Sequence, residues 1–492
     1  MKYFLIGIDG AQEELFFRFN LPFIQEKLSK GVNISLEEDL IGRGWSEICT
    51  GVHASESGAF YERMLMDGSY TVSSEYKLLD ELKVNTNIIP LWDALNANGY
   101  SVGIMNVPTT NIAPKVNGFF VSGGGGGAKV TSEIEDAQCY PKNIKDVLID
   151  NNYIADERLL TLLLEDNIGG NNNYFFSRLK LMNEKRVDSY LRLNNEFNVN
   201  FGFIVFRSIV VVENIFSAEI DRFLKGDKSV NMDIISKLRD FYLHFDSCLE
   251  RLCKGVNAQK IGFISDHGTV PKYNIVNLNF FLKKLGYQNE VLNIKSYIYL
   301  LKTLKRFIPH SIKKILKGNT SIMPIYYSIV NFDKNTSRLF TVNLGSSSGV
   351  YVNDRIRFNG CVEPDNIKNV MHKFIREFNS FAMSKKHNLI AVDCSAKKNG
   401  KHGKYYPDIL IRMPEGYQVE NLNEACSSDF VTPSYNSYNP VFLKDVKHDL
   451  WTGTRGKRPM ATFLNHEFLN DNLCEDHDLT CVYHIVKKEF NL

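Results

Sequence analysis

The chain has 492 residues, of which 44% are hydrophobic and 23% charged, as in an ordinary globular protein with one large α/β domain or two to three domains. Its net charge of +2 produces no global field that would attract nucleic acid, and no segment has the roughly 18 consecutive apolar residues of a membrane span. The nine Cys are scattered without a CxxC pair, which in a chain of this length favours a reducing compartment. We therefore expect a cytoplasmic protein that does not bind nucleic acid.

Strand-like and helix-like patterns alternate along the first half of the chain. In chain order they predict a buried strand at 3–9, a helix at 87–100, strands at 101–107 and 201–206, a helix at 230–253 and a strand at 260–264. Alternation of this kind is typical of a mostly parallel sheet that is covered by helices on both faces. The sequence therefore predicts an α/β fold.

Two segments differ from this pattern. Residues 122–129 contain five consecutive glycines without the phosphate-binding GxxxxGK[ST] spacing, and we interpret them as a flexible connector, with a lining of the site as the alternative. Residues 294–317 contain seven Lys or Arg and no acidic residue, which indicates one or two basic amphipathic helices broken at Pro309. This segment is either a solvated insert or a cap that attracts an anionic substrate or makes weak contact with a membrane surface.

The pattern changes from residue 338 onward. Residues 338–354 predict two strands around a Gly/Ser turn, 365–383 a helix and 405–419 a strand that runs to a turn. These elements suggest a second, smaller subdomain.

Polar side chains follow two of the predicted strands. Asp9 ends the first strand, and Asp266 and His267 come directly after the strand at 260–264. In open α/β sheets, ligands bind outside the carboxyl ends of the strands. Each residue taken singly has an ordinary structural explanation, as a turn cap or a backbone-bonded His, but two carboxylates with an imidazole suit a divalent metal. Together the three residues favour a metal site.

Six segments in a fixed order resemble the alkaline phosphatase superfamily. They read IGIDGA, WSEICTGVHASESGAFY, IIPLWDALNANGYSVGIMNVP, VNGFFVSG, FISDHG…VNLNFFLKKLGY and YYPDILIRMPEGY. Within the superfamily the chain is most similar to the type I phosphodiesterase/nucleotide pyrophosphatase branch, from residue 3 to about residue 463.

The resemblance implies a central, mostly parallel sheet flanked by helices, with an inserted helical cap and a smaller α+β part near the C-terminus. On this basis we expect the core at 1–287 and 440–492, a basic helical cap at 288–337 and the α+β subdomain at 338–439.

The family normally works with two metal ions, often zinc. The resemblance implies that Asp9, Asp266 and His267 hold one ion, next to a Thr or Ser nucleophile that opens a helix. Counting back from Gly51 places this nucleophile at Ile41, which can neither attack nor ligate. Ser46 is the candidate replacement, and a buried helix hydroxyl is its alternative interpretation.

The second metal site of the family has no matching ligands here. Its Asp and His fall on Val210 and Asn214, and its late His falls on Arg455. Glu213 or His448 could compensate for these losses. An arginine can hold phosphate with paired hydrogen bonds, so Arg455 is a candidate catalytic residue. Three further basic side chains are candidates for the same anion pocket, namely Arg43, Lys457 and Arg458. A surface loop position for Arg455 is the alternative.

Three hypotheses remain from the sequence. The first is a metal-dependent hydrolase or phosphotransferase that acts on phosphodiesters or nucleotide-linked groups. It would use one divalent ion (Zn, Mn or Mg) and no organic cofactor, with a phosphorylated small molecule or glycoconjugate as substrate. The second is a catalytically inactive member of the fold that binds a phosphorylated ligand or partner. The third is an ordinary two-metal phosphodiesterase, hidden by a misaligned match near residues 41 and 210.

Overall fold

A computed structural model describes residues 1–124, 133–157, 173–289, 332–341, 349–419, 431–433, 452–466 and 477–492. The chain divides into two compact units. Unit 1 comprises Met1–Tyr61, Ser74–Tyr273 and Pro433–Leu492, and unit 2 comprises Glu62–Ser73 and Asn274–Thr432. Unit 2 thus contains two pieces that the sequence placed in the core, Glu62–Ser73 and 274–287. Most of the expected cap at 288–337 lies outside the described residues, as does the basic segment 294–317.

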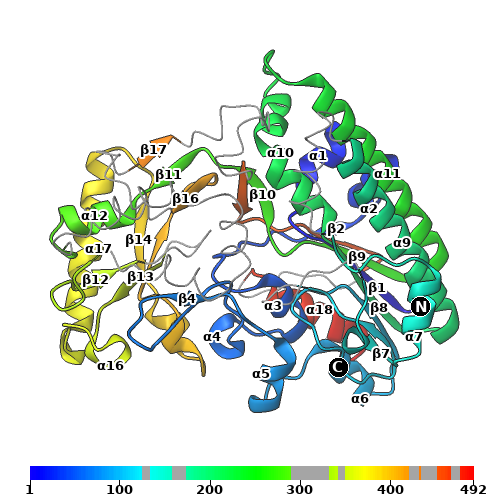
Figure 1. Cartoon of the computed structure of the whole chain (residues 1–492), viewed down its shortest axis with the longest axis horizontal. Helices are drawn as coiled ribbons and strands as arrows, with labels where there is room; N and C mark the ends of the chain where they lie inside the picture. The colour runs from blue at the N-terminus through cyan, green and yellow to red at the C-terminus, as the bar shows by residue number, and fades with distance from the viewer. Residues whose placement is uncertain are drawn as a thin grey trace, which may run out of the picture. The chain divides into compact units, whose positions relative to one another are not determined.

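An eight-stranded sheet forms the centre of unit 1, in the order β2-β19-β9-β1-β8-β5-β6-β7 (Figure 1). Its five middle strands are parallel: β9 (Lys260–Ile264), β1 (Tyr3–Ile8), β8 (Phe201–Phe206), β5 (Val102–Met105) and β6 (Gly118–Val121). The outer strands are antiparallel to their neighbours: β2 (Val32–Asn33), β19 (Ala461–Leu464) and β7 (Cys139–Tyr140). The predicted mostly parallel sheet is confirmed.

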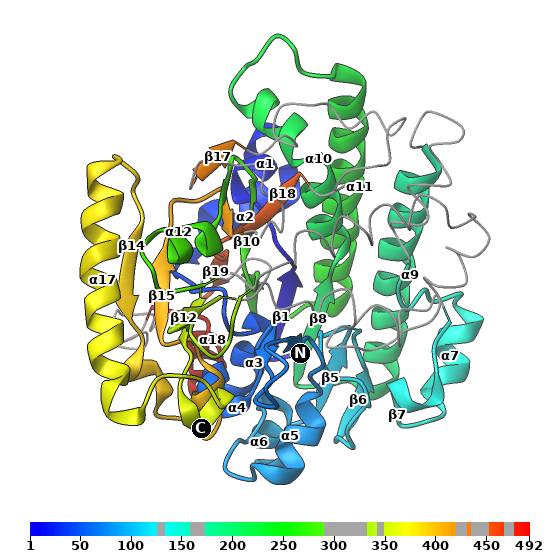
Figure 2. The ribbon, with the colours of Figure 1, turned by 60° about the vertical axis from the view of Figure 1, so that its left-hand side comes forward.

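Both faces of this sheet are apolar, because every residue of β1 is buried and successive side chains point to opposite faces. Phe4, Ile6 and Ile8 pack with one layer of helices, which consists of α1 (Glu13–Arg18), α2 (Pro22–Lys30), α7 (Ile144–Asp150), α9 (Asn173–Phe197), α10 (Ser208–Leu224) and α11 (Met232–Val256). Tyr3 and Leu5 pack with the other layer, which consists of α3 (Gly44–Thr50), α5 (Leu78–Val84), α6 (Leu91–Ala97) and α18 (Thr480–Glu489). Figure 2 shows the long helices α9, α10 and α11 beside the strands.

Shorter elements complete unit 1. A two-stranded antiparallel ribbon of β10 (Gly268–Pro271) and β18 (Gly453–Gly456) follows directly on His267, and the one-turn helix α4 (Ala54–Ser57) follows α3. The ribbon matters for the site because it begins one residue after the predicted metal ligands.

Unit 2 is an α+β structure, as the sequence predicted for this part of the chain. Its four-stranded antiparallel sheet has the order β12 (Leu339–Phe340), β13 (Gly349–Val352), β15 (Ile409–Arg412) and β14 (Ile390–Asp393). Helices α17 (Ile367–Ser384) and α12 (Leu278–Lys284) contribute Phe374, Phe378 and Phe281 to its core. The remaining elements are the strands β16 (Tyr417–Val419), β11 (Asn274–Val276) and β17 (Val431–Pro433), the hairpin β3 (Arg63–Met64) and β4 (Val72–Ser73), and the short helix α16 (Arg355–Phe358).

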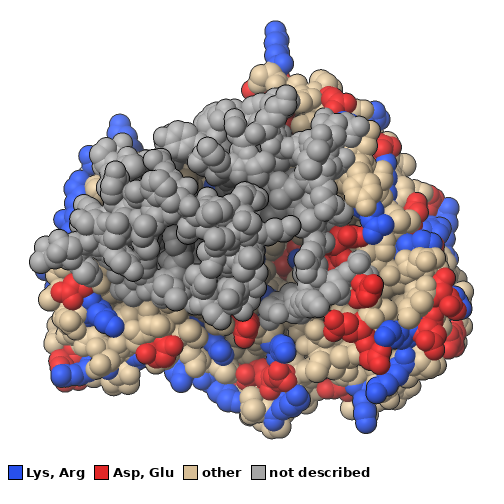
Figure 3. All heavy atoms as spheres, in the orientation of Figure 1, with Lys and Arg blue, Asp and Glu red and all other residues tan. Residues whose placement is uncertain are grey.

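The described residues contain no helix that combines the length and apolarity of a membrane span. On the face shown in Figure 3, the acidic and basic side chains of the described residues are interspersed. The mixture of both signs on this face agrees with the small net charge of the chain.

Candidate metal centre

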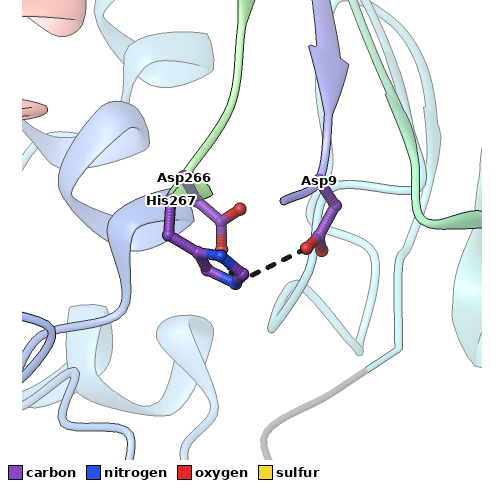
Figure 4. A group of neighbouring side chains, drawn as sticks. All are labelled: Asp9, Asp266 and His267. Atoms are coloured by element: carbon purple, nitrogen blue, oxygen red, sulfur yellow. Dashed lines mark ion pairs between the residues drawn. The ribbon is translucent and has the colours of Figure 1, made fainter. Parts of the chain in front are cut away.

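The three predicted metal ligands meet at the carboxyl edge of the central sheet. β1 and β9 are parallel neighbours with Gly7 opposite Ile264, so the residues that follow them leave the sheet at the same edge. Ligand atoms of Asp9, Asp266 and His267 all lie within 4.8 Å of one another, and all three residues are buried. His267 Nε2 lies 3.8 Å from Asp9 Oδ1 and 3.7 Å from Asp266 Oδ2 (Figure 4).

The donor set of these residues fits a divalent cation. His267 Nδ1 lies 2.7 Å from the carbonyl oxygen of Gly268, to which it can donate only as N–H, so the lone pair of Nε2 faces the two carboxylates. Asp266 Oδ1 is buried without a hydrogen-bond partner. Ligands at about 2.0–2.2 Å from a tetrahedral zinc are roughly 3.3–3.6 Å apart, close to the spacing seen here.

The electrostatics of the site also favour a cation. Burial raises the pKa of Asp9 to about 8, and repulsion by Asp266 adds to this effect, while Arg207 opposes it. Burial lowers the pKa of His267, which favours the neutral imidazole that binds metals. Two buried carboxylates so close together are stabilised in their charged form when a cation lies between them.

Side chains around the ligands fix their orientation. Trp45 Nε1 donates a hydrogen bond of 3.3 Å to Asp9 Oδ2, and Arg207 Nε lies 3.6 Å from the same oxygen, so Oδ1 is the atom turned towards His267. The Tyr61 hydroxyl donates to Asp266 Oδ2 at 3.1 Å. Such partners of a metal ligand set its orientation and basicity.

Trp45, Arg207 and Tyr61 were not among the residues that the sequence predicted for the site. The sequence could have indicated Arg207, because this residue directly follows the strand predicted at 201–206. Residues that follow parallel strands leave the sheet at the same edge, so Arg207 lies at the carboxyl edge together with Asp9. Tyr61 lies in an irregular segment between α4 and β3, and no periodic pattern marks it.

Arg455 lies beside the predicted ligands. It belongs to β18 and pairs with Thr269 of β10, two residues after His267. Its guanidinium carbon lies 3.5 Å from the centroid of the Tyr61 ring, and its charge acts on the pKa of Asp9. The guanidinium is therefore near the metal centre.

Arg43 has a different set of contacts. Its Nε donates to the carbonyl oxygen of Phe60, and its Nη2 donates to those of Tyr61 and Ser74. Arg43 therefore uses its Nε and Nη2 donors to hold the backbone at Phe60, Tyr61 and Ser74. The other two basic candidates are Lys457, which is half-buried, and Arg458, which is exposed.

The two positions examined for a nucleophile are both buried. Ile41 is 5% exposed, and its carbonyl oxygen accepts a hydrogen bond from the backbone N–H of Tyr61. Ser46 is 1% exposed, and its hydroxyl lies 3.4 Å from the Tyr76 hydroxyl. Because Tyr76 packs in the core on the α3 side of the sheet, these contacts favour the interpretation of Ser46 as a buried helix hydroxyl.

Apolar packing occupies positions where the resemblance places the ligands of a second metal ion, which this sequence lacks. A Cβ atom added at Gly10 would lie 2.5 Å from Val210 Cγ2, so the valine packs directly on the residue after Asp9. The Asn214 amide donates to the carbonyl oxygen of Val210, and Glu213 accepts hydrogen bonds from the Tyr242 hydroxyl and the Gln12 backbone. Within the described residues, Asp9, Asp266 and His267 form the one group of three or more side chains suited to a metal. His448 lies outside them.

Comparisons with known proteins agree with this architecture. Residues 3–435 match the family described as type I phosphodiesterase / nucleotide pyrophosphatase. Phosphonoacetate hydrolase from Sinorhizobium meliloti is similar in fold in two complexes. The complex with phosphonoformate has a TM-score of 0.51 at 10% identity, and the complex with phosphonoacetate has 0.52 at 11%; in each case 99% of this chain and 95% of the other chain are covered.

Murine ectonucleotide pyrophosphatase/phosphodiesterase 5 aligns with a TM-score of 0.45 at 12% identity, covering 100% of this chain and 95% of that chain. No curated protein matches the chain.

Proposed function

The chain belongs to the type I phosphodiesterase / nucleotide pyrophosphatase family, and from this premise we propose that it is a phosphoester hydrolase or phosphotransferase that uses a single divalent ion. The observation that carries the proposal is the convergence of Asp9, Asp266 and His267 at the carboxyl edge of the sheet. The ion would be Zn, Mn or Mg, since a mixed set of oxygen and nitrogen donors accepts each of them.

The ion would be held by Asp9 Oδ1, by the carboxylate of Asp266 and by His267 Nε2. When bound, it would supply Lewis-acid stabilisation of charge on the phosphoryl oxygens. Tyr61 holds Asp266 in place through its donated hydrogen bond, and Trp45 does the same for Asp9.

Two guanidinium groups are placed to act on the phosphoryl group. Arg207 contacts Asp9, and Arg455 stacks on the tyrosine that contacts Asp266, so positive charge is present near both carboxylate ligands. Arginine binds phosphoryl oxygens with directed hydrogen bonds, and it stabilises the charge that develops on them during transfer. Because Ile41 carries no hydroxyl, we propose that water or an acceptor alcohol attacks phosphorus directly. The new P–O bond forms as the ester P–O bond breaks, and the proton lost by the attacking hydroxyl is balanced, through solvent, by the one that the leaving alkoxide takes up. Ser46 has no role in this scheme.

The substrate would be a phosphorylated small molecule or a phosphate-linked glycoconjugate, handled in the cytoplasm. A weak contact with membranes through residues 294–317 stays a prediction from the sequence.

A catalytically inactive protein that binds a phosphorylated ligand is the second candidate. The packing of Val210 on Gly10 favours it, because an apolar contact has replaced a ligand position of the family at the residue beside Asp9.

Metal content and activity together test the proposal. Wild type, Asp266→Asn and Asp246→Asn would be purified side by side, with Asp246→Asn as a control that makes the same carboxyl-to-amide change at a buried aspartate, whose carboxylate accepts from the backbone N–H groups of Phe23 and Ile24. We expect about one ion per chain in wild type and in the control, its loss in Asp266→Asn, and metal-dependent cleavage of phosphomonoesters or phosphodiesters that follows the same pattern. Two ions per chain would contradict the single site. One ion without any cleavage would favour the binding protein.

A further inference from the structure

Arg186 is a buried cation without an ion pair among the described residues. It lies on α9, its side chain is 1% exposed, and its Nη2 donates to the carbonyl oxygen of Ala155 at 2.8 Å. Its Nε and Nη1 atoms are buried without a hydrogen-bond partner. Arginine stays charged in proteins, and a buried charge without a partner is strongly destabilising. The guanidinium therefore requires an anion.

The neighbouring carboxylate is already committed to another arginine. Asp156 Oδ2 accepts a hydrogen bond of 3.0 Å from Arg207 Nη1, and Arg207 in turn reaches Asp9 through its Nε. Burial lowers the pKa of Arg186; the charges of Tyr153 and Asp156 oppose this effect, and that of Arg207 adds to it. Asp156 is thus ion-paired with Arg207, and Arg186 has no bonded carboxylate among the described residues.

Further donors near Arg186 also lack acceptors. Asn183 lies one turn earlier on α9 and is fully buried; its Oδ1 accepts from the Ser208 hydroxyl, but its Nδ2 has no partner. Side chains on a helix lean towards its N-terminus, which brings Arg186 over Asn183. Asn106, directly after β5, is 3% exposed; its Oδ1 accepts from the Tyr153 hydroxyl, and its Nδ2 also has no partner.

We propose that Arg186, Asn183 and Asn106 bind an anionic group at the ends of β5 and β8, next to the metal centre. The unpartnered atoms are all N–H donors, and a buried cation stands among them, which is the complement of a phosphate, phosphonate or carboxylate. Arg207 connects this anion site to Asp9.

Two sources could provide such an anion. The first is a second acidic group on the substrate, beside the phosphoryl group at the metal, and this source rests on the proposed function. The second is a free inorganic oxyanion, which does not depend on it.

Binding measurements separate these sources. Calorimetric titrations would compare methylphosphonate with methylenediphosphonate, which carries a second phosphonate, on zinc-loaded wild type, Arg186→Gln and Asp266→Asn. If the substrate provides the anion, wild type prefers the diphosphonate by roughly tenfold or more, as expected for hydrogen bonds to a charged group. Arg186→Gln loses that preference and keeps its affinity for methylphosphonate. Loss of methylphosphonate binding in Asp266→Asn reports on the metal centre separately.

Thermal stability in sulfate tests the other source. If a free inorganic oxyanion occupies the site, added sulfate should raise the melting temperature of metal-free wild type well above the rise that it causes in Arg186→Gln. Wild type should then show no preference for the diphosphonate. The proposal is overturned if sulfate raises the melting temperatures of wild type and Arg186→Gln equally and the two proteins also show the same preference for the diphosphonate over methylphosphonate.

Asn183→Asp is a second variant for the case that Arg186→Gln does not fold. The aspartate has the shape of the asparagine and can still accept the hydrogen bond from Ser208, while it supplies a carboxylate beside Arg186. We expect a higher melting temperature than wild type in the absence of sulfate, and no response to sulfate. A lower melting temperature, or an unchanged response to sulfate, would overturn the proposal.

Discussion

The position of Asp266 depends on single hydrogen bonds from side chains outside the ligand set. Because the Tyr61 hydroxyl donates to Asp266 Oδ2, Tyr61→Phe should weaken metal binding by about tenfold, the lower end of the range for such partners. Competition with a chromogenic chelator measures this affinity. Tyr76→Phe is the matched control, since it removes a buried hydroxyl that contacts Ser46 and the carbonyl oxygen of Ser57. Equal metal affinity in both variants and wild type would exclude this role of Tyr61.

Glu213 should make stability depend on pH. Burial raises its pKa to about 8 despite hydrogen bonds from Tyr242 and Gln12. Between its ordinary value near 4.5 and about 8, the unfolded chain has released this proton while the folded protein retains it, so the free energy of unfolding falls as pH rises. Below this range both states are protonated, and above it the loss is complete.

Glu213→Gln lacks this titration. Its stability relative to wild type should therefore increase from pH 5 to pH 8, by an amount on the order of a few kcal/mol. Denaturation by urea at several pH values measures the difference. Parallel pH profiles for the two proteins would show that the carboxyl group of Glu213 ionises normally in the folded state.

At the scale of secondary-structure elements, the candidate metal centre lies where helix α3 closely approaches the residues that follow β9. A Cβ atom at Gly44, the first residue of α3, would lie 2.7 Å from the carbonyl oxygen of Asp266 and 2.5 Å from Leu479 Cδ1. Only a glycine permits this contact without a shift of the backbone that carries Asp266.

Gly44→Ala should therefore lower both stability and metal affinity. We expect a loss of about 1–3 kcal/mol, as for other overpacked sites, which a denaturation curve measures. Gly124→Ala is the control, because a Cβ atom there would meet only Asp156 Oδ2, at 3.7 Å. Wild-type metal affinity in Gly44→Ala would show that the ligands tolerate a displaced helix.

At the scale of the whole molecule, the chain contains two units with separate hydrophobic cores. The three candidate metal ligands all belong to unit 1, while Phe281, Phe374 and Phe378 belong to the core of unit 2. A ligand stabilises the folded state that binds it, by an amount that grows with its concentration relative to the dissociation constant.

Calorimetric unfolding should therefore show more than one transition, as in other multi-domain proteins. Saturating zinc should raise the transition of unit 1 and leave that of unit 2 in place, and Asp266→Asn should abolish the rise. A single transition that moves as a whole would mean that the two units unfold together.

The amino-acid sequence by itself predicted the mostly parallel sheet and the convergence of the three candidate metal ligands at one of its edges. The apolar runs at 3–8, 201–206 and 260–264 can be buried only as inner strands, and parallel neighbours carry the residues that follow them to one edge. Asp9 and Asp266 could therefore be placed together across more than 250 residues of sequence.

Only the tertiary structure decided what surrounds those ligands. Tyr61 reaches Asp266 from an irregular segment 205 positions away in sequence, and Arg186 is recognised as an unpaired cation only once α9 is packed against its neighbours. Periodicity reports which face of an element is buried, but it carries no information about which polar atoms meet there. The division into units also depended on long-range packing, since Glu62–Ser73 joins residues that lie some 200 positions later in the chain.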